Sequence, residues 1–127
     1  MRRNDAGVTL IEMLVVVTII ALFATLTVPS VVARLEKSKT VATRVQIVNF
    51  EQALMHYKLD TGVFPATEQG LEALRSSPAN VPNWDGPYLV KEIPLDPWGH
   101  RYVYKFPGDG NQPEIISLEA KDQTPAL

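Results

Sequence analysis

The sequence predicts an α+β fold in which one long N-terminal helix, with a transmembrane half and an amphipathic half, packs on a small antiparallel β-sheet. Residues 13–33 carry no charge, and about 20 such residues suffice for a helix to cross a bilayer. Apolar residues then recur at spacings of three and four as far as Lys58, which is typical of an amphipathic helix. Two β-rich segments near the C-terminus are separated by turn residues.

Composition narrows the classes of function. The chain has 127 residues, enough for one domain, and a formal net charge of -2. This charge argues against a strongly basic nucleic-acid-binding protein. The absence of cysteine excludes a disulfide framework, a thiolate metal site and a cysteine nucleophile.

Two residues interrupt the apolar segment. Glu12 is a carboxylate among apolar residues, and a charge in hydrocarbon costs roughly 2.5–3.5 kcal/mol on insertion scales. Glu12 therefore either stays hydrated at the headgroups or needs a cationic partner. Pro29 removes a helical hydrogen bond, so the helix either ends or kinks there. A buried core helix is the alternative to a membrane span, but so long a helix would rarely be apolar on every side in so small a domain.

The amphipathic half is expected to extend to about Lys58, with Gly62 as its C-cap. A helix from Val8 to Lys58 would be roughly 75 Å long at 1.5 Å per residue. We expect its apolar face to pack on the sheet. The apolar positions of this half are Val31, Val32, Leu35, Val41, Ala42, Val45, Val48, Ala53, Leu54 and Tyr57.

The remaining chain predicts short elements. Residues 67–76 indicate a short helix with Thr67 as its N-cap, followed by a proline-rich loop over residues 77–100. Segments 101–106 and 114–118 predict a β-hairpin, because residues 107–111 between them are turn formers. We expect the polar tail, residues 119–127, to be loose.

No catalytic set stands out in the soluble part. Asp96 is expected to cap a turn through nearby backbone amides, while Trp84 and Trp98 would be large contributions to the core. His56 and His100 each lack a second histidine or a carboxylate at metal-ligand spacing. These observations predict a protein that is not an enzyme and has no catalytic or metal-binding residues.

The N-terminal motif carries a family resemblance. The string from Gly7 to Glu12 (Gly-Val-Thr-Leu-Ile-Glu) resembles the processing site of type IV prepilins and pseudopilins, although Val8 stands where the family usually has Phe. The resemblance implies cleavage between Gly7 and Val8 by a prepilin peptidase, followed by N-methylation of Val8. It also implies an assembly or register role for Glu12 and a helix kink at Pro29.

The C-terminal strings narrow the resemblance. Residues 57–65, 67–71, 86–89 and 96–102 resemble the major pseudopilins of type II secretion systems, within the type IV pilin-like superfamily. This implies a pilin-like fold and a structural subunit of a periplasmic pseudopilus, a helical filament that drives export of folded proteins across the outer membrane. The implied partners are further copies in a homo-oligomer, other pseudopilins, an inner-membrane assembly platform and the prepilin peptidase.

The same resemblance implies a domain organisation and a location. Residues 1–7 would be a cleaved leader, residues 8–33 a transmembrane and filament-core segment, and residues 34–127 a periplasmic domain. The chain would be a single-pass protein of the bacterial inner membrane with its C-terminal domain in the periplasm. Lysines and arginines flank both ends of the span, so charge alone does not choose this orientation.

Calcium is the one cofactor that the resemblance raises, because major pseudopilins usually have a longer C-terminal loop that binds it. Here Ser117 to Asp122 is followed by only five residues, and Lys121 stands where an acidic residue is expected. Since Ca²⁺ takes six to eight oxygen ligands, we expect no cofactor, with calcium as the alternative.

Other functions remain open at this point. A type IV pilus subunit or another pilin-like filament protein is the alternative within the class, although such a subunit would more often carry a cysteine pair. An ordinary signal peptide cleaved near Ala33 would instead leave a soluble binding domain. A periplasmic enzyme is the third alternative, without a catalytic set to support it.

Overall fold

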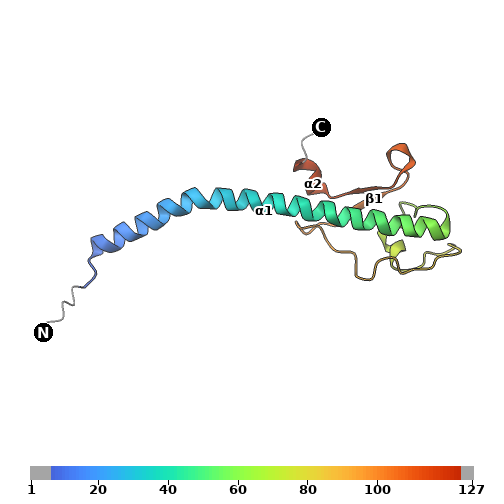
Figure 1. Cartoon of the computed structure of the whole chain (residues 1–127), viewed down its shortest axis with the longest axis horizontal. Coiled ribbons are helices and arrows are strands. Elements are labelled where there is room, and N and C mark those ends of the chain that lie inside the picture. Colours follow the sequence, from blue (N-terminus) through green and yellow to red (C-terminus); the bar gives the residue numbers. More distant parts are fainter. Residues whose placement is uncertain (1–6, 124–127) are drawn as a thin grey trace. The chain divides into compact units, whose positions relative to one another are not determined.

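The computed structural model describes residues 7–123, with side chains as far as residue 120. Helix α1 (Leu10–Thr61) is followed by the 3-10 helix η1 (Leu71–Leu74), strand β1 (Val103–Lys105), the 3-10 helix η2 (Asp109–Asn111), strand β2 (Glu114–Ile116) and helix α2 (Leu118–Gln123) (Figure 1). The chain divides into two compact units, Met1–Lys37 and Ser38–Leu127, and α1 contributes to both.

In the first unit, α1 continues through Pro29 without interruption, so the predicted alternative that the helix ends there is wrong. Its threonine and serine hydroxyls donate to carbonyls of the preceding turn, as Thr18 does to Leu14 and Thr27 does to Phe23. These bonds keep polar side chains satisfied within the helix, which suits a segment surrounded by lipid.

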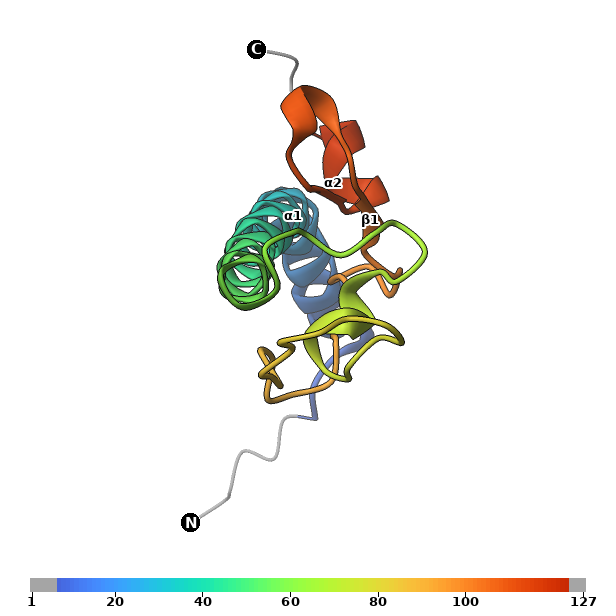
Figure 2. The ribbon, with the colours of Figure 1, turned by 90° about the vertical axis from the view of Figure 1, so that its right-hand side faces the viewer.

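The second unit has one hydrophobic core. In Figure 2 the loops and the hairpin lie to one side of the green part of α1. Edge-to-face aromatic pairs join the elements, such as Phe50 of α1 with Tyr102 at a centroid distance of 5.1 Å. The buried hydrophobic residues are Phe50, Ala53, Leu54, Tyr57, Phe64, Leu71, Ala73, Leu74, Tyr102 and Tyr104.

The predicted hairpin is confirmed. Strands β1 and β2 pair antiparallel, with Tyr104 opposite Ile115 and Lys105 opposite Glu114. Tyr104 is buried between two exposed neighbours, and its hydroxyl donates to the Pro65 carbonyl at 2.8 Å. This bond joins the hairpin to the loop that follows α1.

The end of α1 is also as predicted. The helix ends at Thr61, and the Gly62 amide donates to the Lys58 carbonyl at 2.7 Å. Gly62 has a φ of 88°, a left-handed conformation that glycine adopts without steric cost.

Three local predictions are wrong. Thr67 does not cap a helix: the 3-10 helix starts at Leu71, and the Thr67 hydroxyl instead bonds the backbone of Phe106. Residues 118–123 form α2 rather than a loose tail, whereas residues 124–127 lie outside the described part. Trp84 packs against the core, but Trp98 is only half-buried and lies outside the core cluster.

The expected single apolar face of the amphipathic half is wrong as well. Leu54 and Tyr57 are buried as predicted, but Val41, Val45 and Val48 are about half exposed. This part of α1 therefore has two apolar faces, one on the core and one open.

Candidate functional site

The predicted processing site lies just before α1. Gly7 and Val8 precede the helix and are exposed, and a Cβ built on Gly7 would meet no atom within 4 Å. The helix starts where the Thr9 hydroxyl accepts a hydrogen bond from the Glu12 amide at 3.2 Å. A threonine three residues before a glutamate is the sequence signature of such an N-cap, so this start of the helix could have been predicted from the sequence. Of the expected leader, residues 1–7, residues 1–6 lie outside the described residues.

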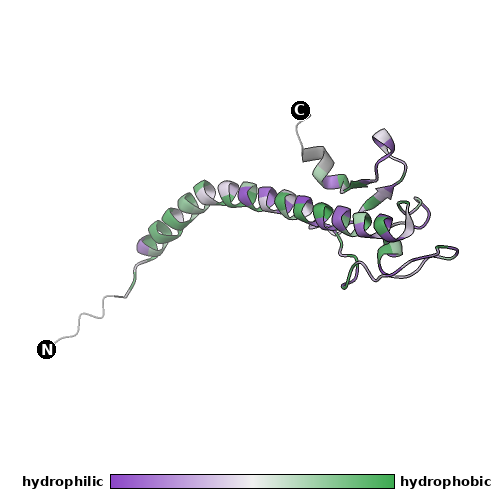
Figure 3. Ribbon diagram, turned by 45° about the vertical axis from the view of Figure 1, so that its right-hand side comes forward, coloured by the Kyte–Doolittle hydropathy of each residue, from purple (hydrophilic) through white to green (hydrophobic). Residues whose placement is uncertain are grey.

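The exposed span is the second part of the site. Every described side chain from residue 7 to residue 35 is exposed, and Figure 3 shows this part of α1 as predominantly hydrophobic. Among the described residues, α1 is the one helix that is long and apolar enough to cross a membrane. Glu12 lies in its first turn and Pro29 lies inside it, so both predicted residues are on this surface.

A third surface, which we call the outer stripe, lies on the second unit. It comprises Val41, Val45, Val48, Gln52, Met55 and Leu59, which recur at alternating spacings of four and three. At about 100° per residue these positions share one side of α1, roughly half a turn from the face of Phe50 and Leu54. The five apolar members are between 48% and 74% exposed.

The outer stripe was not predicted from the sequence, because its residues and those of the core face were taken as one apolar face. The alternation of four and three, which is the spacing of a helix–helix seam, is the signal that could have separated them. Arg44 and Glu51 flank this stripe at positions seven residues apart.

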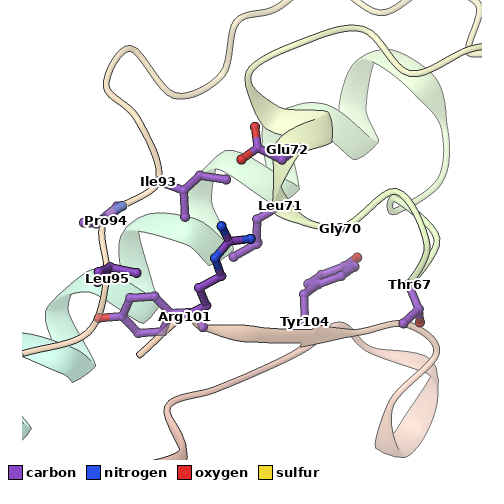
Figure 4. A pocket seen from close by; sticks show the side chains of 10 residues that line it. Thr67, Gly70, Leu71, Glu72, Ile93, Pro94, Leu95, Arg101 and Tyr104 are labelled. Carbon is purple, nitrogen blue, oxygen red and sulfur yellow. The ribbon is translucent and has the colours of Figure 1, made fainter. Parts of the chain in front are cut away.

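A groove lies in the second unit, Ser38–Leu127, which we call the soluble unit. It has a volume of about 330 Å³, and Arg101 and Glu72 reach into it beside Leu71 and Ile93 (Figure 4). Among the described residues, no three His, Asp or Glu side chains come together to hold a metal ion.

Asp96 caps a turn, as predicted from the sequence. Its Oδ1 accepts hydrogen bonds from the backbone amides of Trp98 and His100, and its Oδ2 accepts one from the Ser117 hydroxyl. Burial alone would raise the pKa of the Asp96 carboxyl, but these hydrogen bonds outweigh it and hold the pKa below its ordinary value of 3.8. The carboxylate is therefore ionised in the folded domain.

Comparisons with known proteins agree with this arrangement. A family model described as type II secretion system protein G matches residues 30–126, and a prokaryotic N-terminal methylation motif matches residues 2–28. The type II secretion system core protein G of Pseudomonas aeruginosa is 41% identical over 122 residues, 94% of this chain and 86% of that protein. The protein of the same description from Vibrio cholerae is 40% identical over 95% of this chain and 84% of its own length.

A solved structure gives the same result. The crystal structure of the major pseudopilin from the type 2 secretion system of enterohaemorrhagic Escherichia coli superposes with a TM-score of 0.60 at 32% identity. The match covers 73% of this chain and 86% of that one. Since both the sequence and the fold agree over most of their length, the chain belongs to the protein G family of the type II secretion system, the family of the major pseudopilins.

Proposed function

We propose that this chain is a structural, non-catalytic subunit of a periplasmic pseudopilus, a helical filament that drives export of folded proteins across the outer membrane. The observation that carries this proposal is the distribution of apolar surface on α1. An exposed apolar span is followed by a soluble unit that leaves a second apolar stripe uncovered. Both surfaces suit a protein whose helices pack on further copies of itself.

The same surfaces support a location. The apolar span would hold the chain in the bacterial inner membrane by a single pass, with the soluble unit in the periplasm. Assembly would then require other pseudopilins and an inner-membrane platform, and maturation would require a prepilin peptidase. The net charge of -2 argues against a nucleic-acid partner.

Processing is expected at the bond between Gly7 and Val8, with methylation of the new amine on Val8. Both residues are exposed and precede the helix, so a peptidase can reach the backbone there. Gly7→Glu should leave the precursor uncleaved in the membrane, which mass spectrometry of the membrane-extracted protein measures. Val63→Glu is the control, since Val63 is 62% exposed in the soluble unit, and it should mature normally. Normal maturation of Gly7→Glu would exclude this cleavage site.

Glu12 is expected to pair with the α-amine that cleavage creates. In a bundle of subunits the apolar spans pack on one another, and an unpaired buried charge would be costly, since breaking a buried pair typically costs roughly 3–5 kcal/mol. The amine of Val8 lies about one helical turn from Glu12 in the same chain, and an axially staggered neighbour can present its own amine. Methylation keeps the positive charge of the amine, so the pair survives it.

The test is Glu12→Leu in the full chain. Insertion and cleavage should continue, while filament assembly and secretion should fall, because the ionic pair that rewards correct register is gone. Thr18→Leu is the matched control, since it also adds leucine to the exposed span but removes no charge. If Glu12→Leu assembles and secretes at the wild-type level, Glu12 merely stays hydrated at the headgroups.

We further propose that the outer stripe is a surface on which a second copy of the chain packs. The family is one of filament subunits, so α1 meets copies of itself during assembly. A helix displaced by seven residues, or roughly 10 Å, again places apolar members of the outer stripe opposite one another.

A further inference from the structure

The carboxylate of Asp96 joins two parts of the soluble unit that are 21 residues apart in sequence. Asp96 is 4% exposed. Its Oδ1 accepts from the Trp98 amide at 3.1 Å and the His100 amide at 2.8 Å, and its Oδ2 accepts from the Ser117 hydroxyl at 2.7 Å. Ser117 is also buried and immediately precedes α2, so this last bond fixes the point from which α2 starts.

A second polar contact holds α2 much more weakly. His100 Nδ1 lies 3.8 Å from Glu119 Oε1, and both side chains are about half exposed. An exposed ion pair of this kind contributes little, and it requires a protonated histidine. The bond between Ser117 and Asp96 is shorter, buried and made to a charged acceptor, which places it among the stronger hydrogen bonds of proteins.

Packing of α2 gives a measurable reporter. Ala120 is partly buried and lines a cavity of about 180 Å³ together with Thr43 and Ile47 of α1. Release of α2 would expose this position. Ala73, by contrast, is 2% exposed in the core of the same unit and reports on unfolding of the whole unit.

The donor set here does not fit the calcium ion that the family resemblance raises. Both oxygens of Asp96 already accept hydrogen bonds, and Ca²⁺ takes six to eight oxygen ligands. Among the side chains that the structure describes, residues 7–120, no group of three or more His, Cys, Asp or Glu could hold a metal. The segment after Ser117 is helical, so its carbonyls point along the helix axis instead of converging on one point.

We propose that Asp96 and Ser117 form a metal-independent lock that holds the C-terminal helix α2 on the soluble unit. Amide and hydroxyl donors stabilise the buried carboxylate by hydrogen bonding, whereas a calcium site would need further oxygen ligands. Helix α2 is thus held in place by protein groups alone.

Thiol accessibility in the full chain tests this lock, because the sequence has no cysteine of its own. Ala120→Cys is introduced, the protein is purified in detergent, and the rate of maleimide labelling is measured with EGTA and with millimolar calcium. The rate should be low and equal in both. Adding Ser117→Ala should raise the rate at position 120 by roughly tenfold or more, because a buried charge then lacks one of its donors.

Controls separate a local lock from general damage. Ser76→Ala removes an exposed serine hydroxyl and should leave the labelling rate at position 120 unchanged. Labelling at Ala73→Cys should stay slow in the Ser117→Ala background. The proposal is overturned if calcium slows labelling at position 120, if Ser117→Ala leaves that rate unchanged, or if positions 73 and 120 accelerate together.

Discussion

The outer stripe of α1 gives the most direct test of assembly, through the substitution Val48→Asp. Val48 lies in the middle of the stripe and is 48% exposed. Full burial of a valine side chain stabilises by roughly 1.5–3 kcal/mol, so covering its exposed half would contribute about 1 kcal/mol. Burying an unpaired aspartate adds a desolvation penalty of several kcal/mol, which relaxation and water at the contact reduce.

A net loss of at least about 2 kcal/mol per contact between copies follows, which is roughly a 30-fold weaker contact. Because each subunit in a filament repeats the same contact, the yield of filaments should fall sharply. The folded soluble unit should be little affected, since surface substitutions away from special features usually change stability by less than about 0.5 kcal/mol. Resistance to limited proteolysis checks this last point.

The assay compares the amount of sheared filament and of secreted protein in cells that express each full-length variant at equal level. Val90→Asp is the matched control, because Val90 is 89% exposed but lies in a loop outside the outer stripe. It should behave like the wild type. Wild-type assembly by Val48→Asp, or equal damage by Val90→Asp, would refute the assignment of the outer stripe as a contact between copies.

Two further predictions concern the soluble unit. Tyr104→Phe should lower the free energy of unfolding by about 1–3 kcal/mol in a urea titration, because the buried Pro65 carbonyl loses its donor, whereas Tyr88→Phe, at a more exposed hydroxyl, should cost less. The free energy of unfolding should also fall as the pH drops below about 4. The pKa of Asp96 is lower in the folded than in the unfolded protein, so its ionised carboxylate stabilises the fold above the unfolded pKa. This contribution is lost as the pH falls through the folded pKa. Asp96→Asn should flatten this part of the pH profile, and an unchanged profile would show that other carboxyls cause it.

Several elements could be predicted from the chemistry of neighbouring residues alone. The end of α1 at Thr61 follows from Gly62, and the hairpin follows from alternating residues on either side of a turn. The turn cap by Asp96 also needed only neighbouring amides. Each of these features is decided by residues within a few positions of one another, which is the range over which propensity and spacing carry information.

The roles of Thr67 and Ser117 could not be found in this way. The local sequence predicts Thr67 as an N-cap, yet its hydroxyl donates a hydrogen bond to the carbonyl of Phe106, 39 residues later. The tail after Ser117 reads as polar and loose, yet α2 forms where Ser117 meets Asp96. In both places a contact distant in sequence outweighs the local preference.

The sequence by itself determined the apolar segment that is long enough to cross a membrane and the Gly-Val junction before Glu12 that predicts processing, because neither feature depends on any other part of the chain. Only the tertiary structure decided which apolar residues of the second half of α1 form the core. Val48 and Leu54 are both apolar and both fit helical spacing, but the core elements cover Leu54 and leave Val48 exposed. Periodicity shows that a helix has apolar faces, whereas contacts with other elements decide which face becomes the core and which is left exposed.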